Sequence, residues 1–506
     1  PNGGFDLKYG LRGNLTLDLA INPDFGQAEV DPAVLNLSPF EVYFPERRTF
    51  FLESKEIFET RFQLFYSRRI GRGPSPDRAD QKPRGGETGE IVALDPMTRI
   101  FGALRITGQV RPGWTLGVLT ANTGATFGVE RFGDGLQRRV TVDPITQFSV
   151  VRLRREFDGQ TSVGAILTGV VRGDGEPSAF TGGFDYRIRF RERWRHSAQI
   201  IGTHNGHREG MGAVADLNRT SKRLSFGAVL ETLTPHADFN DIGFMRYNNY
   251  IDGKANVGVF NAQPVGRVRR MAANLSTQVA TSYGLKVPGK QLPLTQKQLH
   301  LDLSLTTLGL WGMTLWAGGH LPQYDIYETR GGIPYLVPFH WWLGGSAYTP
   351  DNKRAVAVFE WAYGEQNGRP GPDYVLELRF RPIERLELTT RGEVHLSVGR
   401  PRWTTTSALG EPVFGRARRI EYAGVLRGTL GILPNLTLQT FNQLYFLSAR
   451  HTEFFILESP DVLVPTNPAP YAGEVDQGLT SFISNSILRW EYRPGSFLFF
   501  VYTHRT

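Results

Sequence analysis

The stretch NLTLDLAIN at residues 14–22 decides the fold, because its polarity changes at almost every residue. Leucine or isoleucine occupies each odd position, and polar residues such as Asp18 lie between them. The stretches FDYRIRF at residues 184–190 and YVLELRFR at residues 374–381 alternate in the same way. A period of two residues is the period of a β-strand, whose successive side chains point to opposite faces. The three stretches are therefore predicted to be strands with one apolar and one polar face.

Alternating stretches of this kind recur along most of the 506 residues. We count roughly twenty, many of about nine to eleven residues, which is the length that crosses a bilayer as a tilted strand. A soluble sandwich would bury its apolar faces and keep its charges outside, but here little else separates the strands. The sequence therefore predicts an all-β fold. Specifically, we expect a large antiparallel transmembrane β-barrel of about 24 strands, with a range of roughly 20 to 26, and an internal plug or constriction segment.

Composition agrees with this prediction and excludes other classes. The hydrophobic fraction is 40% and no stretch of about 18 apolar residues occurs, which excludes a helical membrane protein. Cysteine is absent, which fits an oxidising envelope compartment but is weak evidence. The net charge is +8, but the arginines are spread over alternating positions and do not form one patch, so no nucleic acid partner is expected.

The lengths of the predicted links sort the strands into hairpins. Links such as Pro434-Asn435 and Pro494-Gly495 are tight, whereas those at 123–146 and 449–483 are long, as in outer-membrane barrels. The first three expected strands (14–22, 64–71 and 86–95) fit this alternation least well. The odd number of expected strands predicts that one closing C-terminal strand lies outside this chain. The linker-like start at Pro1 similarly suggests that an upstream module is absent.

Charged side chains on the polar faces are expected to line the lumen, because a charge facing lipid costs roughly 2–4 kcal/mol at the midplane. Either these side chains pair across neighbouring strands and hold the barrel together, or they select a solute. The predicted lumen-facing residues are Arg152, Arg154, Asp185, Arg187, Arg189, Glu377, Arg379, Arg381, Arg391, Glu393, Arg489 and Glu491.

Residues 23–63 break the strand pattern with Pro, acidic residues and several Phe. A barrel of this size has a wide lumen unless something fills it, and the Phe side chains favour burial. We therefore expect an inserted plug or constriction within one barrel domain that spans residues 1–506. Its acids could pair with lumenal arginine, which we favour, or hold a hard cation such as Ca²⁺. These plug acids are Asp24, Glu29, Asp31, Glu41, Glu46 and Glu53.

Several motifs carry a resemblance that extends over nearly the whole chain. They are the runs at 22–27, 30–32, 36–37, 40–41, 44–48, 50–53, 66–71, 238–244, 330–332 and 489–496. Together they resemble a bacterial domain family of unknown function, whose members usually follow a carbohydrate-binding family-9-like module. The resemblance implies an outer-membrane β-barrel that continues past Thr506 into a further strand. It implies no catalytic or binding residues.

No catalytic motif is found. A Gly-x-Ser-x-Gly elbow, a His-Glu-x-x-His motif, a phosphate loop and a cysteine nucleophile are all absent from the sequence. His204 and His207 have a spacing that two zinc ligands can use, but we favour solvated loop histidines. Aromatic residues of the loops at 320–340 and 449–483 could stack on sugars, although an aromatic belt is the favoured interpretation. We therefore expect no enzymatic activity, no metal and no cofactor.

The sequence favours a plugged or constricted channel in the bacterial outer membrane, for a solute or polymer such as a glycan. The alternative is a non-conducting surface platform or assembly subunit that anchors a carbohydrate-binding module or an envelope partner. A membrane-embedded hydrolase is a distant third. The expected partners are outer-membrane lipid and either a glycan or another envelope protein.

Overall fold

Antiparallel β-strands make up most of the chain. The structure is a computed structural model, and it describes residues 3–23, 38–75, 88–158, 160–206, 208–366, 369–407, 409–471 and 473–506. Twenty-five strands belong to a large antiparallel sheet, and further strands form a three-stranded and a two-stranded sheet. Helix is limited, in the described part, to α1 (Thr49–Leu52) and short 3-10 turns. No helix among the described residues is long and apolar enough to cross a membrane.

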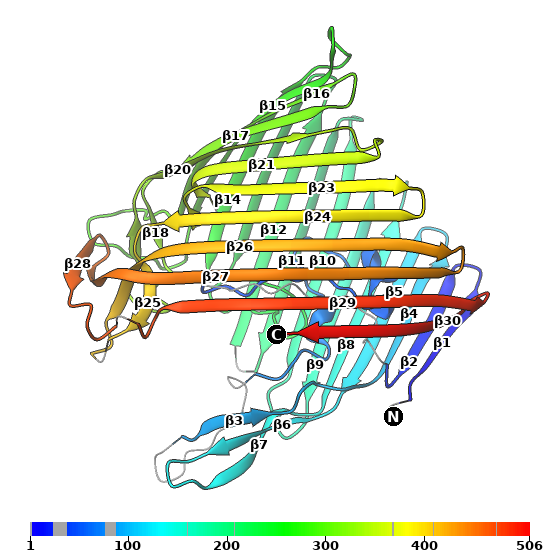
Figure 1. Ribbon diagram of the computed structural model, residues 1–506, viewed down its shortest axis with the longest axis horizontal. Helices are drawn as coiled ribbons and strands as arrows, with labels where there is room; N and C mark the ends of the chain where they lie inside the picture. The colour runs from blue at the N-terminus through cyan, green and yellow to red at the C-terminus, as the bar shows by residue number, and fades with distance from the viewer. Residues whose placement is uncertain are drawn as a thin grey trace. The chain divides into compact units, whose positions relative to one another are not determined.

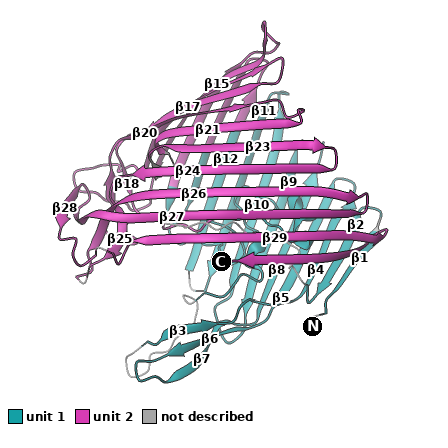
Figure 2. Cartoon of the chain, viewed as in Figure 1, with its two compact units in different colours: residues 1–28, 43–217, 230–250 teal, residues 29–42, 218–229, 251–506 magenta. Residues whose placement is uncertain are grey.

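The chain divides into two compact units, which Figure 2 shows in different colours. Unit 1 comprises residues 1–28, 43–217 and 230–250, and unit 2 comprises residues 29–42, 218–229 and 251–506. Two strands, β12 (Arg208–Thr220) and β13 (Leu224–Leu233), are divided between the units.

Unit 1 contains eight strands that pair in sequence order, each antiparallel to the next. They are β1 (Phe5–Arg12), β2 (Leu15–Ile21), β4 (Ile100–Arg111), β5 (Trp114–Thr123), β8 (Thr146–Glu156), β9 (Ser162–Arg172), β10 (Ala179–Phe190) and β11 (Trp194–Asn205). A separate sheet is formed by β3 (Glu90–Leu94), β6 (Thr126–Arg131) and β7 (Gln137–Asp143).

Unit 2 continues the same pattern with longer strands, several of which lie side by side in Figure 1. They are β14 (Tyr250–Phe260), β15 (Val268–Thr281), β16 (Gln296–Thr307), β17 (Gly312–His320), β20 (His340–Tyr348), β21 (Ala355–Gln366), β23 (Asp373–Ile383), β24 (Leu386–Val398), β26 (Pro412–Leu433), β27 (Leu436–Ser459), β29 (Gln477–Arg493) and β30 (Ser496–Arg505). Shorter strands accompany them: β18 (Gln323–Asp325), β19 (Tyr335–Val337), β22 (Arg369–Pro370), β25 (Arg402–Thr406) and β28 (Val462–Thr466).

Each unit has an apolar and a polar sheet face, as the alternation predicts. On β10, Phe180 and Phe184 are exposed on one face, whereas Asp185 lies on the other. On β23, Leu376 and Leu378 are likewise exposed, and Glu377 between them points to the opposite face. We call the two faces the apolar face and the polar face.

The links between strands also follow the prediction. Short turns join β4 to β5, β10 to β11, β23 to β24 and β26 to β27, whereas long connections join β5 to β8, β17 to β20 and β24 to β26. The links at 173–178, between β9 and β10, and at 206–207, between β11 and β12, are shorter than these long connections.

Of the first three expected strands, one is wrong and another is shorter than expected. Residues 64–71 form a 3-10 turn at Ser67–Arg69 in place of a strand, because their apolar side chains pack on a sheet whose strands are already paired. The expected strand 86–95 is reduced to β3, which belongs to the small sheet. The hairpin partner β1, in contrast, is absent from the expected set. The closing C-terminal strand was expected because the number of predicted strands was odd. That number changes in the structure, and the closing strand stays untested.

Candidate functional site

A segment without strands lies on the polar face of unit 1, and its apolar side chains are buried there. We call residues 43–71 the internal segment. Beneath it, one row of side chains on neighbouring strands of the polar face is buried: Asp18, Arg105, Leu119, Val150, Thr168, Thr181 and Thr203. The buried apolar side chains of the segment are those of Phe51, Phe58, Phe62, Leu64, Tyr66 and Ile70.

Two glycines of the sheet make room for the internal segment. A Cβ atom at position 117 would lie 2.7 Å from Cγ2 of Ile57 and 2.9 Å from Cε1 of Phe58. A Cβ atom at position 183 would lie 3.0 Å from Cδ1 of Leu64. The absence of side chains at Gly117 and Gly183 therefore lets the segment approach the strands closely.

Arg105 of β4 is the first anchor of the segment. Its side chain is 2% exposed and donates hydrogen bonds from Nη2 to Oδ2 of Asp18 at 2.7 Å, and from Nη1 to the backbone oxygens of Phe50 and Glu53. Nη2 also lies 3.2 Å from Oε2 of Glu53. A buried charge needs this kind of complete pairing, because an unpaired ion in the interior is strongly destabilising.

Glu53 extends this anchor to β1, whose Lys8 Nζ lies 2.6 Å from its Oε2. The hydrogen bond from Lys8 holds the pKa of Glu53 below its ordinary value, and the charge of Arg105 adds to the effect. The carboxylate therefore stays ionised between two cations of the sheet.

Gln199 and Asp216 form a second anchor from β11 and β12. The buried Gln199 accepts a hydrogen bond from the backbone N–H of Phe62 at 2.8 Å through Oε1. Asp216 lies 3.6 Å from Nε of Arg61. These contacts hold the middle of the segment at strands that are distant from Arg105 in the sequence.

The loop at residues 234–249 is the third anchor. Arg69 donates from Nε to the backbone oxygen of Gly243 at 3.0 Å and from Nη2 to Oδ1 of Asn240 at 3.1 Å. The backbone N–H of Tyr66 donates to the oxygen of Ile242 at 2.7 Å. The rings of Tyr66 and Phe244 meet edge to face at 5.4 Å. The loop and the internal segment therefore form one packed layer.

Within the segment, Glu46 and Arg48 form an ion pair at 2.6 Å. Arg48 also donates to the backbone oxygens of Ser67 and Ile70, both at 2.8 Å. Burial alone would raise the pKa of Glu46, but hydrogen bonds from Arg48 and Ser67, together with the charge of Arg48, hold the pKa below its ordinary value. The pair therefore stabilises the fold of the segment itself.

The predicted plug acids differ in position and in pairing. Asp24, Glu29 and Asp31 lie outside the described residues. Glu41 is exposed and belongs to unit 2, and Glu46 pairs inside the segment. Glu53 makes the expected ion pair with an arginine of the sheet, and that arginine is Arg105, which the lumen-facing set did not include.

In unit 1, the predicted lumen-facing residues lie on the polar face. Arg152 is buried and forms a bidentate pair with Asp185, with Nη2 at 2.9 Å from Oδ1. Arg154 pairs with Glu156 at 2.6 Å. Arg187 and Arg189 differ, because both are exposed close to the turn between β10 and β11.

In unit 2, the predicted residues form short ladders. Arg391 lies opposite Glu377 in the sheet, 3.4 Å from its Oε2, and 2.5 Å from Oε1 of Glu393. Near the turns, Arg379 pairs with Asp351 and Arg381 pairs with Glu387. Arg489 lies over the ring of Phe497, and Glu491 accepts a hydrogen bond from the backbone N–H of Gly495. Ion pairs between strands therefore account for five of the twelve predicted residues: Arg152, Asp185, Glu377, Arg381 and Arg391.

One comparison with known proteins identifies the family. The family model described as "Domain of unknown function (DUF5916)" matches residues 1–506. The chain belongs to this family. No curated protein matches the chain.

The packed layer brings together stretches of this DUF5916 chain that are far apart in sequence. Residues 44–48 and 66–71 meet through Arg48, and residues 66–71 meet 238–244 through Arg69. Three of the runs that carried the resemblance are thus neighbours in space. The sequence singled out these runs, but it did not show that they contact one another.

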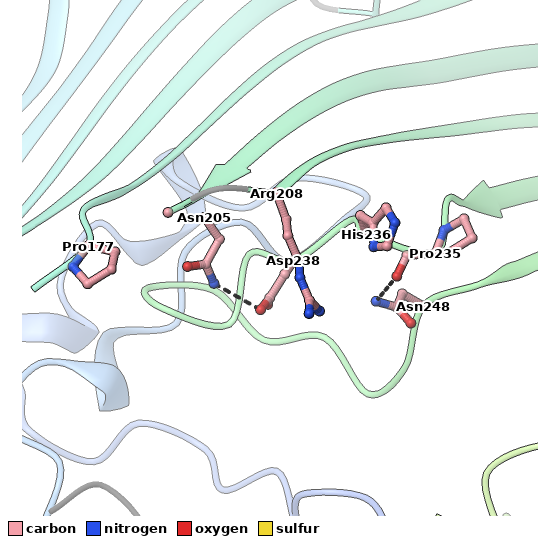
Figure 3. A pocket seen from close by; sticks show the side chains of 8 residues that line it. Pro177, Asn205, Arg208, Pro235, His236, Asp238 and Asn248 are labelled. Atoms are coloured by element: carbon pink, nitrogen blue, oxygen red, sulfur yellow. Dashed lines mark hydrogen bonds between the residues drawn. The ribbon is translucent and has the colours of Figure 1, made fainter. Parts of the chain in front are cut away.

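A surface pocket of about 380 Å³ lies beside this layer, lined by eight residues from the ends of β10 and β11, the start of β12 and the loop at 234–249. Figure 3 shows Asn205 pointing toward Asp238 across the pocket, at 3.0 Å. At the other end of the pocket, Asn248 donates from Nδ2 to the backbone oxygen of Pro235. These amides hold the loop in place, so their donor groups are already engaged.

The zinc interpretation of His204 gains no support. His204 is exposed and lies 3.8 Å from Glu209, and His207 lies outside the described residues. Within the described ranges, no group of three or more His, Cys, Asp or Glu residues could hold a metal ion.

Some of the loop aromatics are buried, whereas Phe339 and Trp341 are exposed. Tyr324, Tyr335, Trp342 and Phe454 are buried, and Tyr335 packs against Phe414 in a small apolar cluster of unit 2. Trp341, in contrast, is exposed beside Tyr363. Exposed aromatics at strand ends are typical of a membrane interface.

Proposed function

We propose that this protein is a transmembrane β-barrel of the bacterial outer membrane, and that the internal segment constricts its lumen. It would serve as a channel for a polar solute or polymer. The observation that carries the proposal is the position of residues 43–71, which are folded on the polar face of unit 1 above a continuous buried row of side chains.

The membrane part of the proposal is supported by what the apolar face exposes. Leu167 and Ile200 in unit 1 and Leu299 in unit 2 are more than half exposed, on strands whose other face carries charge. Water is a poor solvent for a continuous apolar surface of this kind, and patches beyond a few hundred Å² usually mark a membrane or protein contact. Lipid tails against this face would remove the apolar side chains from water, while the charges would remain inside.

The constriction is supported by how firmly the segment is held. Three separate anchors attach it to β4, β11 and the loop at 234–249, and the first contains a fully paired buried arginine. A segment that merely rested on the sheet would need no buried ion. Residues of both signs on the polar face favour a polar cargo, whereas the glycan remains an expectation from the resemblance alone.

Conductance in planar bilayers tests the proposal. We expect a variant that lacks residues 43–63 to conduct much more than the full chain, because the segment would no longer occupy the lumen. A smaller change is expected from Gly117→Val, whose side chain would collide with Ile57 and Phe58. The matched control is Gly202→Val, since a Cβ atom at Gly202 has no neighbour within 4 Å.

The same anchors favour a second candidate, the non-conducting platform. A segment held at three places could close the barrel permanently and leave it to anchor a carbohydrate-binding module or an envelope partner. If the deletion variant inserts into the bilayer and opens no pore, the channel is wrong and the platform replaces it.

A further inference from the structure

The hairpin of β10 and β11 ends in an unusually basic tip. Residues 187–195 read RIRFRERWR, with five arginines and one glutamate, and we call them the basic tip. All five arginines are exposed. The tip lies at the end of unit 1 strands where the short turns are found.

The arginines of the basic tip are poorly neutralised. Arg189 lies directly opposite Arg195 in the hairpin, an arrangement of like charges that destabilises a strand pair. Arg189 donates to the backbone oxygen of Glu192 at 2.6 and 2.8 Å, which satisfies its donors but not its charge. No ion pair is recorded within the described ranges for Arg187, Arg191, Arg193 or Arg195.

Neighbouring acids are already engaged elsewhere. Glu156 pairs with Arg154 at 2.6 Å. Asp158 accepts hydrogen bonds from the backbone N–H groups of Gln160 and Thr161, and these bonds hold its pKa below the ordinary value. The excess positive charge of the tip therefore faces solvent.

The backbone of the turn is strained at two charged residues. Arg191 and Glu192 both have positive φ values, 48° and 57°, in the left-handed region that favours Asn and Gly. Non-glycine residues in this region destabilise the native state. Glycine at these two positions would form the same tight turn without strain.

Apolar and aromatic side chains adjoin the charges. Phe184, Ile188 and Phe190 are exposed on the apolar face of β10 and lead to the tip. Trp194 stacks on Phe190 with ring centroids 6.2 Å apart. A band of apolar residues that ends in Trp and then Arg matches the order of a bilayer, from tails through the interface to the headgroups.

We propose that the basic tip binds the phosphate groups of anionic phospholipids at one edge of the bilayer. The inference rests on the proposed function, because it requires that β10 and β11 cross a membrane. Arg191 and Arg193 extend from the turn into the headgroup layer, whereas Arg189 and Arg195 lie on the polar face of the hairpin and add to the positive charge near it. The selected lipid is therefore anionic.

Lipid selectivity tests the inference in the full chain, reconstituted in phosphatidylcholine bilayers. The probe is spin-labelled phosphatidylglycerol, compared with spin-labelled phosphatidylcholine, and the measured quantity is the relative association constant at the protein surface. We expect wild type to prefer phosphatidylglycerol, and Arg191→Gln with Arg193→Gln to lower the preference by about threefold or more. High salt is expected to reduce the wild-type preference similarly.

The control is Arg208→Gln with Arg450→Gln, which removes two exposed arginines outside the tip. An equal loss in the control, or no loss in the tip variant, would overturn the inference. Failure of the proposed function looks different, because wild type would then not insert into the bilayer at all. Insertion with equal association of both labelled lipids would reject the basic tip alone.

Discussion

At the scale of single residues, we expect the ion pair of Arg105 to stabilise the candidate site more than the ion pair of Lys8 does. The exposed pair of Lys8 and Glu53 should contribute little, since surface ion pairs are worth roughly 0–1 kcal/mol. Arg105 and Asp18 are both buried, and loss of one partner from such a pair costs roughly 3–5 kcal/mol. The first of the three anchors of the internal segment therefore depends on a single guanidinium group.

Arg105→Met is expected to lower the free energy of unfolding by about 3–5 kcal/mol, because the buried Asp18 would be left with the exposed Lys8, whose Nζ lies 4.0 Å from its Oδ1. Urea unfolding in lipid vesicles measures this change. The double variant Arg105→Met with Asp18→Leu should recover part of the loss, since it removes both charges. Equal stability of wild type and Arg105→Met would show that the anchor is unimportant.

At the scale of elements, β17 and β20 interlock through reciprocal pairs of tryptophan and glycine. Trp316 lies opposite Gly344, and Trp342 lies opposite Gly318. A Cβ atom at position 344 would lie 2.5 Å from Cε2 of Trp316, and one at position 318 would lie 2.4 Å from Cζ2 of Trp342. Each indole thus covers the glycine of the neighbouring strand, a device that fixes strand register.

Gly344→Val should destabilise unit 2 by about 1–3 kcal/mol, because the new side chain would collide with the ring of Trp316. Trp fluorescence during denaturant unfolding reports the change. Gly392→Val serves as the control, as a Cβ atom there has no neighbour within 4 Å. The interlock is unimportant if both variants unfold at the same denaturant concentration.

The strands were predictable from sequence because alternation is a local signal. It places Leu15 and Leu17 on one face, and it marks Asp18 and Arg105 as polar positions. It also misleads at residues 64–71, where Leu64, Tyr66 and Ile70 are buried by packing on the sheet and not by strand pairing. The anchor was not predictable, because Asp18 and Arg105 are 87 residues apart and nothing local links them.

At the scale of the whole molecule, the proposed function requires that lipid covers the apolar face throughout. Leu303 and Ser304 are neighbours on β16 and point to opposite faces, with Leu303 42% exposed. In water an exposed leucine tolerates replacement by arginine, since a surface substitution usually changes stability by no more than about 0.5 kcal/mol. In lipid the same replacement buries a charge among hydrocarbon tails.

Leu303→Arg is therefore expected to lower the free energy of unfolding in vesicles by about 2–4 kcal/mol, whereas Ser304→Arg should change it little. Both variants add one arginine at adjacent positions of one strand, so the change in net charge is matched. Unfolding of each variant in phosphatidylcholine vesicles measures the difference, and equal stability of the two would mean that this face does not meet lipid.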